Sequence, residues 1–125
     1  RGINQDIINF SPQKKYDLIV SISTLEHIGW DEPDKDHKKI LKAITKMKSF
    51  LKKNGKIIVS IPLGYNPFID KYIKNKQINF EKKTLLKRTS IKNIWQQSTW
   101  NLKNIKYNYP FPSANGVVVG IIKNE

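Results

Sequence analysis

The stretch that decides the fold of this chain is Tyr16-Asp17-Leu18-Ile19-Val20-Ser21-Ile22-Ser23-Thr24-Leu25-Glu26-His27-Ile28. Its segment 18–22 is almost continuously apolar and rich in branched residues, which is typical of a strand covered on both faces by helices. Polar residues follow at once, including the adjacent Glu26 and His27. Ligands of open α/β sheets bind outside the carboxyl ends of the strands. The stretch therefore predicts a buried strand that ends in a functional site.

The residues that follow predict further helices and strands. Apolar residues recur at helical spacing over residues 37–53, with Asp36 as the N-cap and Gly55 as a left-handed cap after the helix. Residues 56–61 predict a second buried strand, and the loop 62–67 after it should face Ser23 and Thr24. We expect a helical segment over 68–78, a hairpin over 80–95 that turns near 90–93, and a final strand over 117–122.

The order of these segments resembles the carboxyl-terminal half of a class I S-adenosylmethionine-dependent methyltransferase. The resemblance rests on the sequence Leu-Glu-His-Ile at 25–28, on the predicted helix over 37–53 that ends at Asn54-Gly55, and on the predicted strand over 56–61. Upstream it includes Asn4-Gln5-Asp6-Ile7. It implies a Rossmann-like α/β fold. We expect a three-layer sheet, mostly parallel with an antiparallel final strand and a penultimate strand at the edge, incomplete at the amino-terminal side.

The same resemblance implies a site for the cofactor S-adenosylmethionine. Asp6 would accept a hydrogen bond from the adenine amino group, beside the backbone of Ile7, while Ser23, Thr24 and Leu25 would line the methionine side. An equally good interpretation of Asp6 is a turn residue that binds its own backbone.

The acceptor side of the site is less specific. His27 is a candidate base for the methyl acceptor, since its unperturbed pKa lies near neutrality. The alternative, which we favour, is that Glu26 and His27 cap the turn or bind the backbone. Trp30, Tyr65 and Asn66 are substrate-side candidates by position alone, and aromatic residues there fit ordinary packing as well.

One part of the family pattern is missing. The resemblance calls for a glycine-rich turn after the first strand and an acidic residue after the second, and none of the six glycines stands in such a turn. The first residue is Arg rather than Met. We therefore expect residues 1–125 to be the carboxyl-terminal part of a single domain, inactive by itself in methyl transfer to a small-molecule or saccharide acceptor.

Composition limits the other classes of function. The net charge of +13 suggests nucleic acid, but 21 of the 23 basic residues are Lys, spread along the chain, so a dedicated nucleic-acid surface is not favoured. No run is apolar enough for a membrane span. Cysteine is absent and histidine occurs twice, so we predict no metal site and expect a cytoplasmic protein.

Two alternatives to an enzyme stay open. One is a basic nucleic-acid-binding module, whose binding would depend strongly on salt. The other is a non-catalytic α/β interaction domain, which would form a homodimer through an exposed sheet edge.

Overall fold

The fold is a five-stranded mixed sheet with two α-helices, and the computed structural model describes residues 2–124. The strands are β1 (Tyr16–Ile22), β2 (Leu51–Pro62), β3 (Lys82–Ser90), β4 (Ile94–Ser98) and β5 (Gly116–Lys123). The helices are the 3-10 helix η1 (Leu25–His27), α1 (Lys39–Ser49) and α2 (Pro67–Lys74). Every predicted element is therefore present, with shifted ends.

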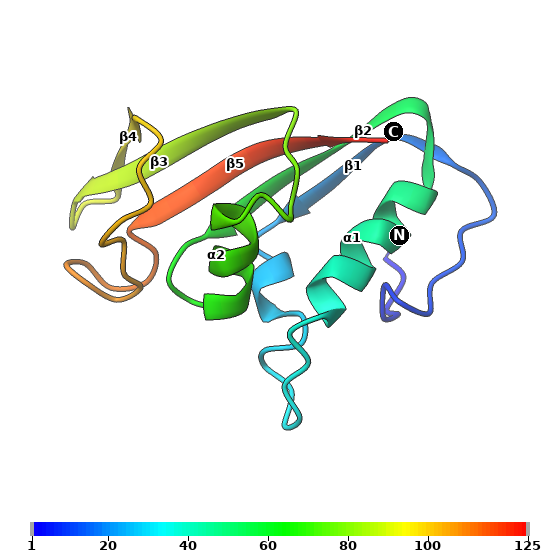
Figure 1. The fold of residues 1–125 in the computed structure, drawn as a ribbon, viewed down its shortest axis with the longest axis horizontal. Coiled ribbons are helices and arrows are strands. Elements are labelled where there is room, and N and C mark those ends of the chain that lie inside the picture. Colours follow the sequence, from blue (N-terminus) through cyan, green and yellow to red (C-terminus); the bar gives the residue numbers. More distant parts are fainter. Residues whose placement is uncertain (1, 125) are drawn as a thin grey trace.

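The sheet has the order β1-β2-β5-β3-β4 (Figure 1). β1 and β2 run parallel, whereas the β2–β5, β5–β3 and β3–β4 pairs are antiparallel. The final strand is antiparallel and the penultimate strand lies at one edge, as predicted. The fold class is confirmed as a mixed, Rossmann-like α/β sheet, although among these pairs the antiparallel ones outnumber the parallel one.

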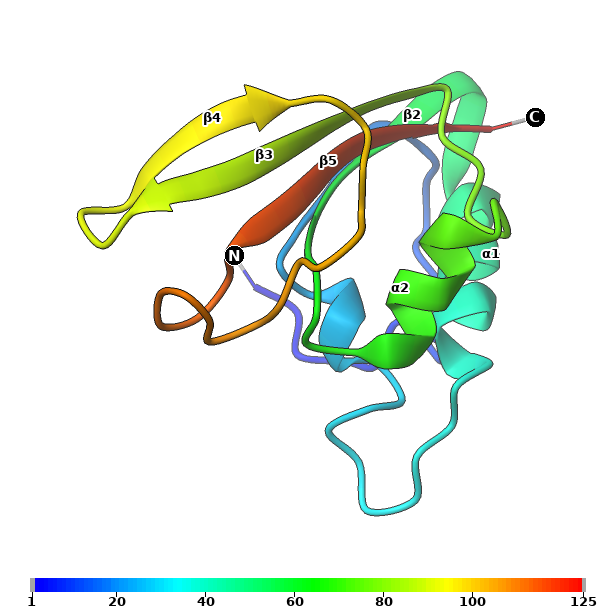
Figure 2. The ribbon, with the colours of Figure 1, turned by 60° about the vertical axis from the view of Figure 1, so that its left-hand side comes forward.

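Both α-helices lie on the same face of the sheet, which Figures 1 and 2 show from two directions. Ile57, Val59 and Ile61 of β2 point to this face and are 0% exposed, in one cluster with Ile40 and Ile44 of α1. Burial of these branched side chains drives the packing of the helices against the sheet. The described residues thus form two of the three predicted layers.

The opposite face of β1 is open, which corrects the prediction of a strand buried on both faces. Leu18, Val20 and Ile22 are 51%, 53% and 68% exposed, and Ile58 beside them on β2 is 36% exposed. No other described strand pairs with the outer side of β1. The apolar run is a reliable signal for a strand, but it does not show that both faces are covered.

The junction between α1 and β2 differs from the prediction in a second way. The helix ends at Ser49, and Asn54, not Gly55, takes the left-handed backbone with φ of 66°. Gly55 lies within β2, where a Cβ atom would come 2.9 Å from the Lys52 carbonyl oxygen. The glycine is therefore needed for close backbone approach and does not cap the helix.

The start of α1 is also shifted. The N-cap position is Lys38, which makes no side-chain cap, while Asp36 accepts a hydrogen bond from the Lys38 backbone at 3.1 Å. Asp36 stabilises the turn before the helix, so the capping residue was placed two positions too early.

Candidate functional site

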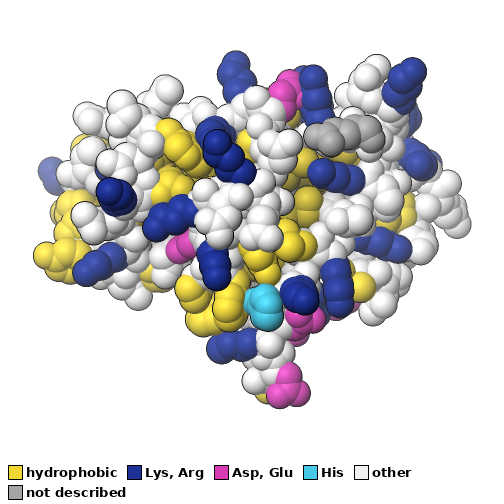
Figure 3. All heavy atoms as spheres, viewed as in Figure 1, with side chains coloured by type: hydrophobic (Ala, Val, Ile, Leu, Met, Phe, Trp, Pro, Cys, Tyr) yellow, Lys and Arg dark blue, Asp and Glu magenta, His cyan; other side chains and the backbone are white. Residues whose placement is uncertain are grey.

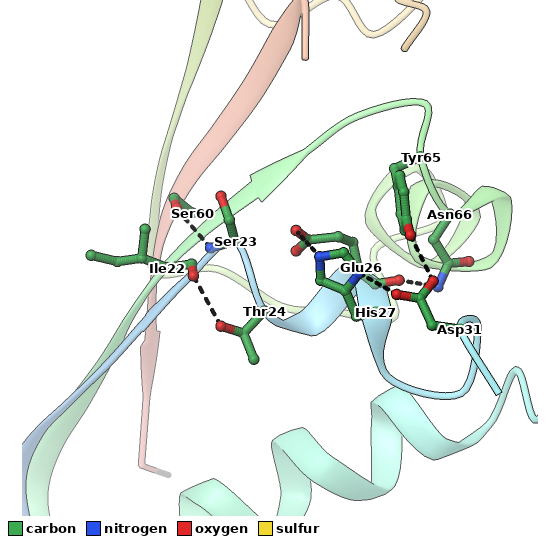
Figure 4. Close-up of polar contacts among 9 residues, drawn as sticks. All are labelled: Ile22, Ser23, Thr24, Glu26, His27, Asp31, Ser60, Tyr65 and Asn66. Atoms are coloured by element: carbon green, nitrogen blue, oxygen red, sulfur yellow. Dashed lines mark hydrogen bonds and ion pairs between the residues drawn. The ribbon is translucent and has the colours of Figure 1, made fainter. Parts of the chain in front are cut away.

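The site lies at the carboxyl ends of β1 and β2, where two loops meet as predicted. After β1 the chain turns sharply at Ser23, whose φ is 46° and whose N–H donates to the Ser60 carbonyl oxygen at 3.0 Å. The Thr24 hydroxyl donates to the Ile22 carbonyl oxygen at 2.9 Å. These bonds tie the turn to the sheet and direct η1 toward the β2–α2 loop (Figure 4).

The buried side chain of Asn66 connects η1 to the start of α2. It is 1% exposed, and its amide donates to the Glu26 carbonyl oxygen at 2.9 Å while its oxygen caps α2 through Phe68 N–H at 2.9 Å. Both ends of the amide are used within the protein. Asn66 therefore fixes the position of η1, which is a structural role that its sequence position did not indicate.

His27 stands at the centre of a polar cluster drawn in Figure 4. Its Nδ1 lies 2.5 Å from Asp31 Oδ2, and the Tyr65 hydroxyl donates to Asp31 Oδ1 at 2.6 Å. The His27 and Tyr65 rings also meet edge to face, with centroids 4.9 Å apart. His27 binds a side chain instead of capping the turn, so the interpretation that we favoured from sequence does not describe it.

The charges in this cluster reinforce one another. The Tyr65 hydroxyl, and then His27, hold the pKa of Asp31 below its ordinary value, so Asp31 is ionised near neutrality. The same hydrogen bond to Asp31 raises the pKa of Tyr65 to about 12, which keeps its hydroxyl protonated as the donor.

Glu26 is the buried member of the cluster. Its side chain is 2% exposed, Oε2 lies 3.4 Å from His27 Nε2, and Oε1 has no hydrogen-bond partner. Loss of hydration raises the pKa of the Glu26 carboxyl above its ordinary value. A buried carboxyl group with an orphaned oxygen is costly, and such groups concentrate at functional sites.

A cavity of about 530 Å³ opens beside this cluster. Its floor is apolar, from residues of β1, η1 and α1, and its rim is polar. The lining includes Asp6, Ile7, Thr24, Leu25 and His27 of the predicted site. Ser23, Trp30, Tyr65 and Asn66 are not among the lining residues.

Asp6 makes two contacts within the chain. Its Oδ1 accepts a hydrogen bond from Ile8 N–H at 2.9 Å, which is the turn geometry considered from sequence. Its Oδ2 lies 3.5 Å from the Lys39 ammonium group. The Ile8 N–H bond, followed by the Lys39 charge, lowers the pKa of Asp6, so the carboxylate stays ionised at the rim of the cavity.

The three substrate-side candidates have different surroundings. Trp30 packs edge to face on Phe68 at 5.6 Å and lies under the Lys35 ammonium group at 4.1 Å. Tyr65 contacts the ring of Tyr107 at 5.2 Å as well as His27. Tyr65 thus belongs to the polar cluster, Trp30 packs beside it, and Asn66 lies below it.

Asp31 is the functional candidate that sequence reasoning missed. It follows His27 by four residues, and its N–H, like that of Trp30, donates to the His27 carbonyl oxygen at 3.2 Å. Gly29 closes this turn with φ of 70°, and a Cβ there would lie 2.1 Å from the Asp36 carbonyl oxygen. An Asp four residues after a His, with a glycine between them, was the available signal.

The cavity fits one side of the predicted cofactor. Its apolar floor suits an adenine ring, and the ionised Asp6 at the rim is an acceptor suited to an exocyclic amine. Within residues 2–124 there is no group of three or more His, Cys, Asp or Glu residues that could hold a metal ion. No helix of the described chain is long and apolar enough to cross a membrane.

Comparison with known proteins gives a likeness of fold. No family model matches the chain, and no curated protein matches it. Among solved structures, the chain is similar to the N-methyltransferase NodS from Bradyrhizobium japonicum WM9 in complex with S-adenosyl-L-homocysteine, with a TM-score of 0.59 and 14% sequence identity. The match covers 98% of this chain and 53% of NodS, so the chain spans about half the length of that protein. The chain therefore shares its fold with about half of NodS.

Proposed function

We propose that the chain is the carboxyl-terminal part of an S-adenosylmethionine-dependent methyltransferase domain that acts on a small-molecule or saccharide acceptor in the cytoplasm. The observation that carries this proposal is the cavity at the carboxyl end of β1, which is lined by Asp6, Thr24 and His27. The methyltransferase fold, shared with a protein bound to S-adenosyl-L-homocysteine, supports it.

In this proposal the residues that line the cavity would hold the cofactor. Asp6 would accept a hydrogen bond from the adenine amino group beside the backbone of Ile7, while Thr24 and Leu25, which follow Ser23 in the turn, would border the methionine side. When bound, the sulfonium supplies an electrophilic methyl group. The protein contributes orientation and exclusion of water.

His27 faces the same cavity and is 47% exposed, so it is placed to take a proton from an acceptor. A base is needed only when the attacking atom carries a proton. Trp30 and Tyr65 then border the acceptor, whereas Asn66 supports η1 from beneath.

The described residues would contact the cofactor from one side only. The described residues include no glycine-rich turn after a strand, and the outer side of β1, which borders the cavity, has no paired strand. We therefore expect this chain to bind cofactor weakly and to transfer methyl groups poorly until another segment or chain completes the site.

The open edge also favours a second function, that of an interaction domain which forms a homodimer. β1 carries no Pro or Lys, the residues that protect edge strands, and presents Leu18, Val20 and Ile22 to solvent. Nucleic acid is less favoured, because the basic side chains on the face shown in Figure 3 are scattered and form no single patch.

The deciding measurement is the melting temperature of the chain with and without excess S-adenosyl-L-homocysteine. Ligand at about 100 times its dissociation constant adds roughly 2.7 kcal/mol, which moves a domain of this size by several degrees. Asp6→Ala and Thr24→Ala should reduce the shift. Asp17→Asn, at the opposite end of β1, is the matched control and should leave it unchanged.

Absence of a shift in the unchanged chain would contradict cofactor binding by the cavity of this chain alone. A shift that Asp6→Ala and Thr24→Ala leave intact would place the ligand elsewhere. A sedimentation measurement on the same samples would then decide for or against the homodimer.

A further inference from the structure

Asp31 links three segments that meet at the site. It lies in the loop after η1, binds His27 of η1 through one carboxylate oxygen, and accepts a hydrogen bond from Tyr65 of the β2–α2 loop through the other. Figure 4 shows Tyr65 and His27 reaching Asp31 from different elements. A carboxylate held at both oxygens has little freedom to rotate.

The Asp31 contact decides which nitrogen of His27 carries a proton. An ionised carboxylate offers only acceptors, so the ring nitrogen that it binds must be the donor. In the neutral ring Nδ1 is therefore protonated and Nε2 keeps its lone pair. Free imidazole side chains have no such constraint.

The other ring nitrogen, Nε2, lies beside a buried carboxyl group. His27 Nε2 makes no hydrogen bond in the described structure, and its nearest acidic neighbour is the buried Glu26 carboxyl, with Oε2 at 3.4 Å. The ring itself lines the cavity. Nδ1 is thus held by a hydrogen bond to Asp31, whereas Nε2 makes only the longer contact with Glu26 Oε2.

We propose that Asp31 and Tyr65 are positioning residues that hold His27 as a base with its proton on Nδ1 and its lone pair on Nε2. This proposal rests on the proposed function, because it assigns the base of that reaction. As the acceptor atom forms its bond to the methyl group, the carbon–sulfur bond of the sulfonium would break and its electron pair would stay on sulfur. The acceptor proton would move to His27 Nε2, His27 would become a cation beside the Asp31 carboxylate, and the proton would later leave to solvent.

Tyr65 has a separate part in this arrangement. Its hydroxyl fixes the Asp31 carboxylate, and its ring lies edge to face against the imidazole at 4.9 Å. The β2–α2 loop thereby supports the orientation of a side chain on the β1 side of the site. Loss of the hydroxyl alone should loosen the carboxylate without removing it.

The test is the tautomer of His27, read from long-range proton–nitrogen NMR correlation spectra of the whole chain under mildly alkaline conditions. The chain has two histidines, so a His37→Gln variant assigns both sets of ring signals. We expect the Nδ1-protonated form to dominate in the unchanged chain. In Asp31→Ala the ratio of the two tautomers should fall by about tenfold or more, the effect of losing a charge-assisted hydrogen bond.

Three further variants complete the design. Asp31→Asn keeps an acceptor oxygen and should show an intermediate ratio. Tyr65→Phe should raise the pKa of the Asp31 carboxyl and shift the ratio by less than Asp31→Ala. Asp34→Ala, in the same exposed loop, is the matched control and should change nothing.

An unchanged tautomer ratio in Asp31→Ala would overturn the proposal, and an unchanged Asp31 pKa in Tyr65→Phe would remove Tyr65 from it. These spectra need neither cofactor nor acceptor. An unchanged tautomer ratio together with a normal melting-temperature shift by S-adenosyl-L-homocysteine therefore rejects the positioning role alone. A changed tautomer ratio without a melting-temperature shift rejects the cofactor site.

Discussion

β1 and β2 contain the same four residues, Ile-Val-Ser-Ile, at 19–22 and at 58–61, and lie side by side in parallel. Their exposures are nevertheless opposite: Val59 and Ile61 are 0% exposed, while Val20 and Ile22 are 53% and 68% exposed. The pairing explains the difference. Val20 lies opposite Ile58 and not Val59, so the two copies are offset by one residue.

A shift of one residue moves every side chain of a strand to the other face. In β2 the phase directs Val59 and Ile61 toward α1 and α2, whereas in β1 it directs Val20 and Ile22 to the open face. The comparison shows that an identical local sequence is core in one strand and surface in the next. Whether a strand residue is buried therefore depends on the helices that cover one face of the sheet, and not on the composition of the strand.

The largest expected effect comes from truncating the equivalent isoleucines. Ile61→Ala should lower the free energy of unfolding by about 2 to 5 kcal/mol, because it leaves a cavity between the sheet and the helices. Ile22→Ala is the matched control in β1 and should cost less than about 0.5 kcal/mol. Urea denaturation measures both. Equal losses would mean that another element covers the β1 face.

The contrast also marks how much of the fold the sequence could reveal. Hydrophobic runs located β1, β2 and β5, a weaker pattern placed a hairpin over 80–95 where β3 and β4 lie, and helical spacing located α1 and α2. These signals are local. The exposure of Leu18, Val20 and Ile22 depends on what lies above the sheet. No local pattern contains that information.

The candidate site shows the same division. Thr24, Leu25 and His27 are predicted because they directly follow an apolar strand, and all three line the cavity. Asp31 was missed because its partner Tyr65 lies 34 residues away. Asn66 was placed on the substrate side because its hydrogen bond to the Glu26 carbonyl oxygen depends on the position of η1, which the sequence does not show.

A smaller effect is expected at Asp70, on the helix-covered side. Burial raises the pKa of this carboxyl from 3.8 to about 6, and Oδ1 has no partner although Oδ2 accepts a hydrogen bond from Gly64 N–H at 2.8 Å. The folded state thus binds a proton more tightly than the unfolded state. Stability therefore falls as pH rises from about 4 to 6, and the full penalty remains above 6.

Asp70→Asn removes this charge and keeps an oxygen for the Gly64 bond. We expect it to stabilise the chain by about 1 to 2 kcal/mol above pH 6, after allowance for partial exposure, and to flatten the loss between pH 4 and 6. Thermal melts across this pH range provide the measurement. Asp17→Asn on the exposed end of β1 is the control, and a similar gain there would show that net charge, not burial, is responsible.

The smallest effect on stability is expected for Val20→Lys on the open face. A half-exposed side chain loses little on substitution, so the free energy of unfolding should change by less than about 0.5 kcal/mol. A lysine on an edge strand opposes pairing with a second copy, however, so self-association in sedimentation velocity should weaken. If Val20→Lys instead destabilises the chain as strongly as Ile61→Ala, a partner that folds with this chain covers β1, and its two copies of Ile-Val-Ser-Ile are both core. If stability and self-association are both unchanged, β1 is a solvent-facing edge and the homodimer proposal fails.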